Sequence, residues 1–146
     1  MPRLPLTIAV LLCALLRLAG AQVAVIVHPE VSTEELSRQQ LLDIYAGETR
    51  LWNENLPIVV FDQKRKDGPR NRFYDFLGRS PSRMKSVWLV NLLSGEGDPP
   101  RIVENDAEMV RQVAGTPGAI GYVAAVSVTD SIRVLMTIPA VSGKDP

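Results

Sequence analysis

A cluster of cations lies where an apolar run gives way to a proline that is well placed to begin a helix: Lys64, Arg65, Lys66 and Arg70. The first N–H groups of a helix have no partner in the helix and carry partial positive charge, so they attract anions. Gly68 would let a ligand approach the backbone closely. The pattern predicts an oxyanion pocket in which Arg70 offers its planar guanidinium to the ligand. A solvated basic turn is the alternative interpretation.

Two other polar residues are candidates for the same pocket. Asp67 carries a carboxylate, which repels an anion unless it accepts a hydrogen bond from a protonated ligand or pairs with a cation. Ser94 begins the sequence Ser-Gly-Glu-Gly and could offer a hydroxyl group, although capping a helix end is its simpler role. The predicted ligand-binding residues are therefore Lys66, Asp67, Gly68, Arg70 and Ser94.

Metal and nucleophilic chemistry find little support in the sequence. His28 is the sole histidine and Cys13 the sole cysteine, which are too few for a zinc site. A Ser–His–Asp triad would have to use His28, and no serine lies in a nucleophile motif. We predict no metal, no cofactor and no enzymatic activity. The 16 basic and 16 acidic residues balance, so there is no overall positive field to hold a nucleic acid.

Residues 1–21 are typical of a cleaved secretory signal peptide. Arg3 supplies the positive start, residues 6–16 form an apolar run, and Ala19-Gly20-Ala21 matches a cleavage site. The run of 11 residues is much shorter than the ~20 that a membrane-spanning helix needs. We therefore expect a free periplasmic protein without a stable membrane anchor. Because Cys13 lies in the removed segment, the mature chain could form no disulfide.

Two apolar runs predict strands covered on both faces, namely Val23–Val27 and residues 58–61. Between them, Ser32 and Glu35 match the capping box that begins a helix, and Gly47 is placed to end it. The residues expected on the buried face of this helix are Leu36, Leu41, Ile44 and Tyr45. After the second strand, residues 62–68 are predicted to form a polar turn.

Three further helices are expected. Pro69 begins the first and Gly78 ends it, Ser80-Pro81 begins the second, which ends at Ser94-Gly95, and Asn105 with Glu108 caps the third. The expected core residues are Phe73, Phe76 and Leu77 in the first, Met84, Val87, Trp88 and Leu92 in the second, and Ala107, Val110, Val113 and Ala114 in the third.

Strands are also predicted over residues 119–123 and Arg133–Ile138. Strands that alternate with helices indicate an α/β fold in three layers, with helices on both faces of a mostly parallel sheet. We expect one domain over residues 22–140 and a frayed tail over residues 141–146. In such sheets ligands bind at the carboxyl ends of the strands, which is where the cationic segment lies.

Several segments together resemble a known family. They are VAVIVHP, LSRQQLLDIYAGETRLWNENLPIVVFDQ, RNRFYDFLGRSPSRMKSVW, SGEGDPPRIV and PGAIGYV. In order and spacing they resemble the second lobe of the phosphate-binding proteins of bacterial ABC importers, and more closely the short single-lobe periplasmic proteins of that group. The resemblance implies a periplasmic-binding-protein-like lobe that holds an oxyanion through hydroxyls, N–H groups and an arginine, without catalysis.

By position, the family's ligand loop falls on residues 66–70, and Arg70 keeps the arginine. The chain departs from the family at Asp67, where a serine is usual, so one hydroxyl donor is missing. It also has only one lobe, whereas the full receptors close two lobes around the ligand. A half-site open to water should bind weakly unless a second chain completes the cleft.

Two functions fit these observations. The first is a periplasmic solute-binding module for phosphate or a similar oxyanion, associated with an ABC permease, a sensor protein or a second copy of itself. The second is a non-catalytic interaction module of the cell envelope that has the lobe's fold and binds no ligand.

Overall fold

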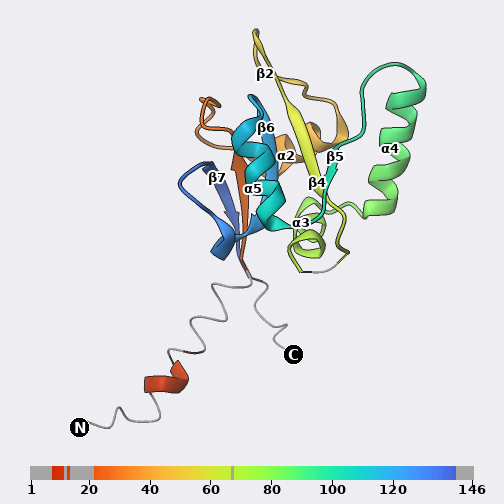
Figure 1. Cartoon of the computed structure of the whole chain (residues 1–146). Helices are drawn as coiled ribbons and strands as arrows, with labels where there is room; N and C mark the ends of the chain where they lie inside the picture. Colours follow the sequence, from red (N-terminus) through yellow and green to blue (C-terminus); the bar gives the residue numbers. More distant parts are fainter. Residues whose placement is uncertain (1–7, 12, 14–21, 67, 141–146) are drawn as a thin grey trace.

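The computed structural model describes residues 8–11, 13, 22–66 and 68–140. A five-stranded sheet runs through the molecule in the order β5-β4-β6-β1-β7, and a short hairpin, β2 and β3, forms a separate two-stranded sheet (Figure 1). The strands are β1 Val23–Val27, β2 Leu51–Asn53, β3 Leu56–Pro57, β4 Val59–Gln63, β5 Arg101–Val103, β6 Ala119–Ala124 and β7 Arg133–Ile138. The helices are α2 Arg38–Ala46, α3 Pro69–Leu77, α4 Pro81–Leu93 and α5 Asp106–Gly115, with a 3-10 turn, η1, at Ala125–Ser127.

The sheet is mainly parallel in direction. β4 pairs in parallel with both β5 and β6, while β1 runs antiparallel between β6 and β7. Four strands therefore point one way and β1 alone points the other way. This confirms the predicted α/β class with a mostly parallel sheet. The ends of β4 and β6 consequently lie at one edge of the sheet, where a ligand site is expected.

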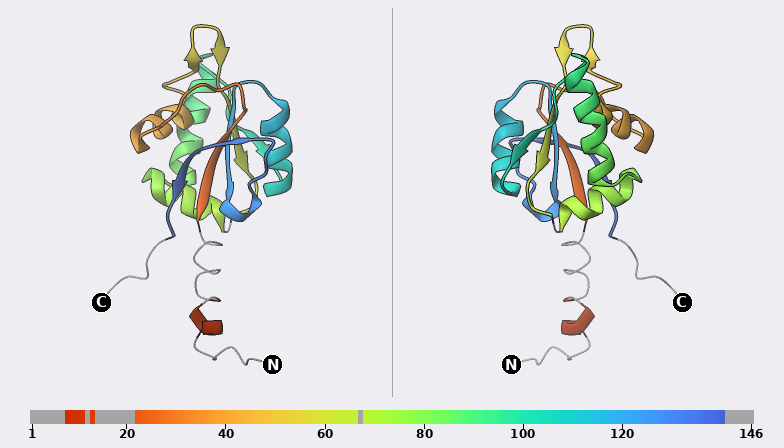
Figure 2. Two further views of the ribbon diagram at one scale, coloured as in Figure 1. Left: turned by 90° about the vertical axis from the view of Figure 1, so that its left-hand side faces the viewer. Right: turned by 90° about the vertical axis from the view of Figure 1, so that its right-hand side faces the viewer.

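Helices cover both faces of the sheet, which explains why β1 is apolar throughout. Val23, Val25 and Val27 face a core shared with α2, α3 and α4, whereas Ala24 and Ile26 face a core shared with α5. All five residues of β1 are buried, as the continuous apolar run predicted. Figure 2 shows α5 on one side of the sheet and the other three helices on the opposite side.

The predicted helix ends are confirmed at α3 and α4. Gly47 and Gly78, which follow α2 and α3, adopt the left-handed conformation, with φ of 79° and 72°. Pro69 is the first residue of α3, and the Ser80 hydroxyl caps α4 through the Arg83 N–H. Of the residues expected in their cores, Phe73, Leu77, Met84 and Trp88 are buried.

The start of α2 was predicted wrongly. The capping box is Ser37 with Gln40, five residues beyond the Ser32 and Glu35 of the prediction. The Arg133 guanidinium donates hydrogen bonds to the carbonyl oxygens of Val31 and Thr33. Because those carbonyls are held by a side chain from β7, the segment before Ser37 does not enter the helix.

Three other predictions need correction. Asp62 and Gln63 are buried residues of β4, not part of a polar turn. Leu92 of α4 was expected in the core but is exposed. Ala107 of α5 was also expected there and is exposed, whereas Met109 of the same helix is buried. β5 and the β2–β3 hairpin were not predicted, because strands of two or three residues show no measurable periodicity.

Among the described residues, no helix has both the length and the apolar character required to cross a bilayer. Residues 8–11 and 13, from the predicted signal peptide, are helical. The rest of that segment and the predicted tail, residues 141–146, lie outside the described residues.

Candidate functional site

A cavity of about 520 Å³ opens at the carboxyl ends of β4 and β6, between the starts of α3 and α5. Its described lining comes from three parts of the chain: Gln63, Arg65, Gly68 and Pro69 from the end of β4 to the start of α3, Asn105, Asp106 and Ala107 at the start of α5, and Ala124 and Ser127 at the end of β6 and in η1. Polar groups from these separate segments converge on one space. We call it the carboxyl-edge cavity.

The start of α3 is open towards this cavity. Gly68 occupies the N-cap position with φ of 55°, and it has no side chain to cap the first turn. Pro69 follows, and the first turn contains no acidic residue. The N–H groups of this turn therefore keep their partial positive charge for a partner outside the helix.

The start of α5 is closed by its own residues. The Asn105 side chain accepts a hydrogen bond from the Glu108 N–H, at 2.9 Å, and the Glu108 carboxylate accepts one from the Glu104 N–H. Asp106 and Glu108 also place negative charge in the first turn, which offsets the positive end of the helix dipole. This helix end has little left to offer an anion.

Asp106 ties the wall of the cavity together. Its carboxylate accepts hydrogen bonds from Gln63 Nε2 at 2.7 Å, from the Ala124 N–H at 3.0 Å and from the Ser127 hydroxyl at 2.8 Å. The three donors come from β4, β6 and η1. Its negative charge is therefore largely engaged by the protein itself.

A second carboxylate, Asp62, is buried behind the start of α3 and is only 1% exposed. It accepts hydrogen bonds from the hydroxyls of Tyr122 at 2.5 Å and Tyr74 at 2.8 Å and from the Gln63 N–H at 2.9 Å. Arg70 Nε lies 3.7 Å from Asp62 Oδ1, and its guanidinium lies over the Tyr74 ring. This buried network joins α3 to β4 and β6.

Burial raises the pKa of Tyr74 and of Tyr122 well above the ordinary value, and the nearby negative charge of Asp62 raises both further. The pKa of Tyr45, whose hydroxyl donates to the Phe61 carbonyl at 2.8 Å, is raised for the same two reasons. All three phenols therefore stay protonated in the folded protein at neutral pH and act as hydrogen-bond donors.

The structure places the five sequence-predicted site residues differently. Gly68 lines the carboxyl-edge cavity. Lys66, two residues before Gly68, is exposed to solvent. Arg70 is buried against Asp62 and Tyr74 and is not among the described lining residues. Asp67 lies outside the described residues. Ser94 caps the carboxyl end of α4, which lies away from α3 in Figure 1, and its hydroxyl donates to the Val90 carbonyl.

Sequence reasoning missed the two aspartates that organise the site. Asp62 directly follows the apolar run of residues 58–61, which is a usual place for a functional carboxylate, but its tyrosine partners lie 12 and 60 residues away. Asp106 follows the N-cap of a helix, a position that acidic residues often occupy for helix stability alone. Neither signal distinguishes a site residue from a structural one without the fold.

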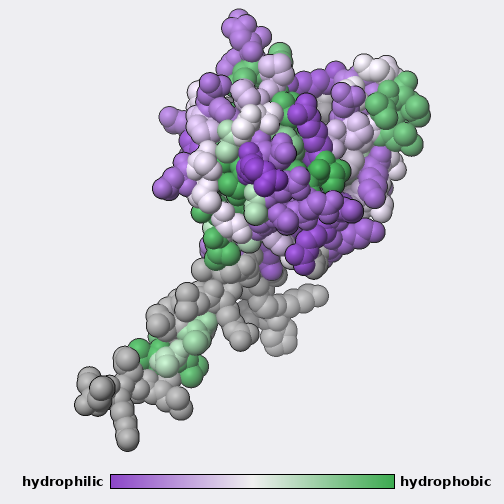
Figure 3. Space-filling model, viewed as in Figure 1, coloured by the Kyte–Doolittle hydropathy of each residue, from purple (hydrophilic) through white to green (hydrophobic). Residues whose placement is uncertain are grey.

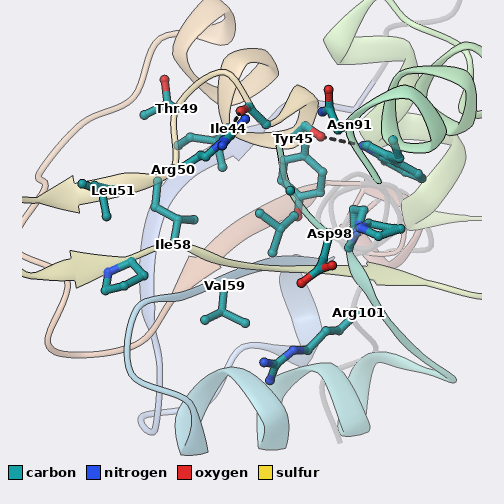
Figure 4. A pocket seen from close by; sticks show the side chains of 17 residues that line it. Ile44, Tyr45, Thr49, Arg50, Leu51, Ile58, Val59, Asn91, Asp98 and Arg101 are labelled. Carbon is teal, nitrogen blue, oxygen red and sulfur yellow. Dashed lines mark hydrogen bonds between the residues drawn. The ribbon is translucent and has the colours of Figure 1, made fainter. Parts of the chain in front are cut away.

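A second cavity, of about 360 Å³, lies at the opposite edge of the sheet, beside the start of β4 and the loop before β5. Here the carboxyl end of α2 is closed by side chains: Trp88 Nε1 donates to the Tyr45 carbonyl, Asn91 Nδ2 to the Ala46 carbonyl and Arg50 Nε to the Gly47 carbonyl. Figure 4 shows Arg101 and Asp98 on its other side. Apolar side chains, among them Ile44, Ile58 and Val59, also line this second cavity.

No protein-family model matches the chain. Solved structures do match it. An ABC-type phosphate transport receptor from Vibrio cholerae is 20% identical with a TM-score of 0.61, over 79% of this chain and 46% of the receptor. A putative phosphate ABC transporter substrate-binding protein from Clostridium perfringens, solved with bound phosphate, is 25% identical with a TM-score of 0.64, over 79% and 45%. PstS from Borrelia burgdorferi is 20% identical with a TM-score of 0.54, over 79% and 47%.

These matches confirm the fold class and the resemblance drawn from the sequence. The chain spans less than half the length of each of these proteins. That share is consistent with a single lobe of a phosphate-receptor fold.

Proposed function

We propose that this chain is a single-lobe, non-catalytic binding module for phosphate or a similar oxyanion. The observation that carries the proposal is the open start of α3. It begins at a glycine without a side-chain cap, has no acid in its first turn, and borders a cavity at the carboxyl edge of the sheet. A helix of nine residues whose first turn receives no side-chain cap from the described residues is a favourable seat for a small anion.

The surroundings of α3 support an anion more than a cation. Arg65 lines the cavity and Lys66 is exposed nearby. The opposing carboxylate, Asp106, already accepts three hydrogen bonds, which reduces its repulsion of a bound anion. Arg70 then acts as a positioning residue, because its contact with Asp62 fixes the first turn of α3 against the sheet.

Affinity should be low and sensitive to salt. The cavity is open to water in the single lobe that the structure describes, and an exposed charge interaction is screened by ions. Enclosure in a cleft between two lobes would lower the local dielectric and strengthen the same hydrogen bonds. We therefore expect binding in the millimolar to high micromolar range, about −4 to −6 kcal/mol.

The biological setting follows from the same proposal. The chain is exported to the periplasm by the segment over residues 1–21 and collects or reports an anion there, beside an ABC permease or a sensor protein. The likeness to ABC-type phosphate receptors supports this setting.

Titration calorimetry at low ionic strength with phosphate, sulfate and molybdate tests the proposal. Ala107 lines the cavity and is exposed in the first turn of α5. Ala107→Glu adds a negative charge at the cavity in a position where helices tolerate acids. We expect it to weaken anion binding at least tenfold without loss of stability.

Ala107→Gln is the matched control, because it has the same size without the charge, and it should bind like the original protein. Arg111→Gln removes a positive charge from the exposed surface of α5, outside the described cavity lining, and should also leave binding nearly unchanged. Absence of heat with all three anions at millimolar concentration would refute the proposal, as would equal effects of all three substitutions.

A further inference from the structure

The face of α4 that points away from the core carries an uncovered apolar patch. Four large apolar side chains of its carboxyl half are exposed: Leu89 by 54%, Val90 by 63%, Leu92 by 47% and Leu93 by 78%. Figure 3 shows this patch over α4. Single exposed leucines are ordinary on protein surfaces, but a contiguous group on one helix is typical of an interaction surface.

The residues that lie opposite the core form one narrow stripe: Ser82, Ser86, Leu89 and Leu93. Their spacing of four, three and four residues keeps them on a single line along the helix. Met84 and Trp88 are buried on the opposite side. The stripe thus has two small polar residues in its amino half and two leucines in its carboxyl half.

The charges around the stripe are divided in the same way. Arg79, Arg83 and Lys85 lie at or near the amino end of α4, and all three are exposed. Glu96 and Asp98 lie in the exposed loop that follows its carboxyl end. The amino end of the helix therefore has small side chains in the stripe and basic side chains around it. The carboxyl end has leucines in the stripe and an acidic loop beside it.

We propose that this face of α4 pairs with α4 of a second copy of the chain, with the two helices antiparallel. This arrangement brings Leu89 and Leu93 of one copy against Ser86 and Ser82 of the other. Large side chains then fit beside small ones, on both sides of the two-fold axis. The basic end of each helix lies beside the acidic loop of the other copy.

A parallel arrangement of the two helices would pair neither large side chains with small ones nor basic ends with acidic ones. Leucines would meet leucines at one end, while serines faced serines at the other and left a gap. The three cations near each amino end would also lie together, and like charges at an interface cost energy. Charge and side-chain size therefore favour the same antiparallel orientation.

The size of the contact sets the expected strength. α4 has 13 residues, about 20 Å of helix, so a single helix pair falls below the usual area of a stable interface. The pair should form reversibly, with a dissociation constant in the micromolar range or weaker. This inference does not depend on anion binding at the carboxyl-edge cavity.

Sedimentation over a range of protein concentrations is the first test. We expect a monomer–dimer equilibrium, and we expect the double variant Leu89→Ser with Leu93→Ser to weaken it at least tenfold. Val126→Ser, which removes an apolar side chain that is 70% exposed outside α4, is the matched control and should leave the equilibrium unchanged. A monomer at all concentrations, or a dimer unaffected by the double variant, would overturn the proposal.

Cysteine cross-linking tests the orientation, in a chain that carries Cys13→Ser. Ser82→Cys and Leu93→Cys, each in a separate protein, should form a disulfide dimer when mixed under mild oxidation. Each variant alone should cross-link at least tenfold less, because equivalent positions are far apart in an antiparallel pair. Equal cross-linking of each variant with itself would contradict the antiparallel arrangement. Circular dichroism confirms that each variant keeps its fold.

Discussion

Two helices begin at the same cavity, yet their starts are built in opposite ways. α5 is capped by Asn105 and carries Asp106 and Glu108 in its first turn, so its own residues satisfy it. α3 begins at Gly68 without a side-chain cap or an acid. Each start is backed by a carboxylate, buried Asp62 behind α3 and half-buried Asp106 at α5. The contrast shows that a helix start without a side-chain cap can be held in place by a buried hydrogen-bond network on its core side.

Alkaline pH should have the largest effect, and it should act on the α3 side. There the donors to Asp62 include tyrosine hydroxyls, which ionise at high pH, whereas the described donors to Asp106 do not. The pKa values of Tyr74 and Tyr122 are raised by burial and by Asp62, and that of Tyr45 is raised as well. Above pH 10.0, the ordinary tyrosine value, the unfolded chain loses phenolic protons that the folded chain keeps. The free energy of unfolding then falls with rising pH, by about 1.4 kcal/mol per pH unit for each tyrosine.

The measurement is the near-ultraviolet absorbance of tyrosinate, followed together with the helical circular dichroism. The chain has three tyrosines, so we expect both signals to change in one transition. A tyrosine that ionises near pH 10.0 while the fold is intact would contradict the raised pKa values.

Asp62→Ala should be the most damaging single substitution on the α3 side. It leaves Arg70 buried without its carboxylate and removes the acceptor of two tyrosine hydroxyls. We expect a loss of about 3–5 kcal/mol in the free energy of unfolding, measured by urea denaturation. A loss below about 1 kcal/mol would mean that the network contributes little to holding α3.

Asp106→Ala should lower the free energy of unfolding less than Asp62→Ala does. It should also strengthen anion binding at the carboxyl-edge cavity. The half-buried Ala124 N–H and Ser127 hydroxyl lose their partner, which should cost about 1–2 kcal/mol. Removal of a negative charge from the cavity should at the same time tighten binding of an anion. Denaturation and calorimetry on the same variant separate the two effects, and weaker anion binding would contradict the proposed site.

Asn105→Ala opens the start of α5 and so makes it resemble that of α3. The Glu108 N–H loses its side-chain acceptor, and the expected cost is about 1 kcal/mol. Asn105→Ser keeps a capping group and should recover most of that loss. Equal stability of the two variants would show that the cap does not distinguish the helices.

The smallest effect is expected for Lys64→Gln, at the surface contact between the residues that directly follow β4 and β5. Lys64 Nζ lies 3.3 Å from Glu104 Oε1, and both side chains are largely exposed. Exposed pairs of this kind contribute less than about 1 kcal/mol, so the denaturation midpoint should hardly move. A large loss would indicate a role for Lys64 that its surface pairing does not explain.

Much of the fold was predictable because its signals are local. β1 is a continuous apolar run, and Pro69, Gly78, Ser80 and Asn105 mark helix ends through the chemistry of single residues. The capping box was misplaced because Ser32 and Ser37 offer similar local patterns. The carbonyl groups on both sides of the first of them accept hydrogen bonds from a distant side chain, Arg133, which no local pattern indicates.

The site was harder to predict, because its organisation is not local. The cationic segment pointed to the start of α3, where Gly68 lines the cavity, and its role as a ligand site stays a prediction. The inward position of Arg70 depends on Asp62 and on a tyrosine from each of two elements. No spacing rule in the sequence connects residues 62, 74 and 122.

The pairing of Val23 with Ile138 places the first and last strands of the sheet side by side at one edge. A domain entered and left at neighbouring points can be spliced into a loop of another protein with little distortion of either. This architecture makes the lobe a portable unit for engineering. Fluorescent proteins or a second lobe could be joined there, close to the carboxyl-edge cavity, without cutting through the sheet.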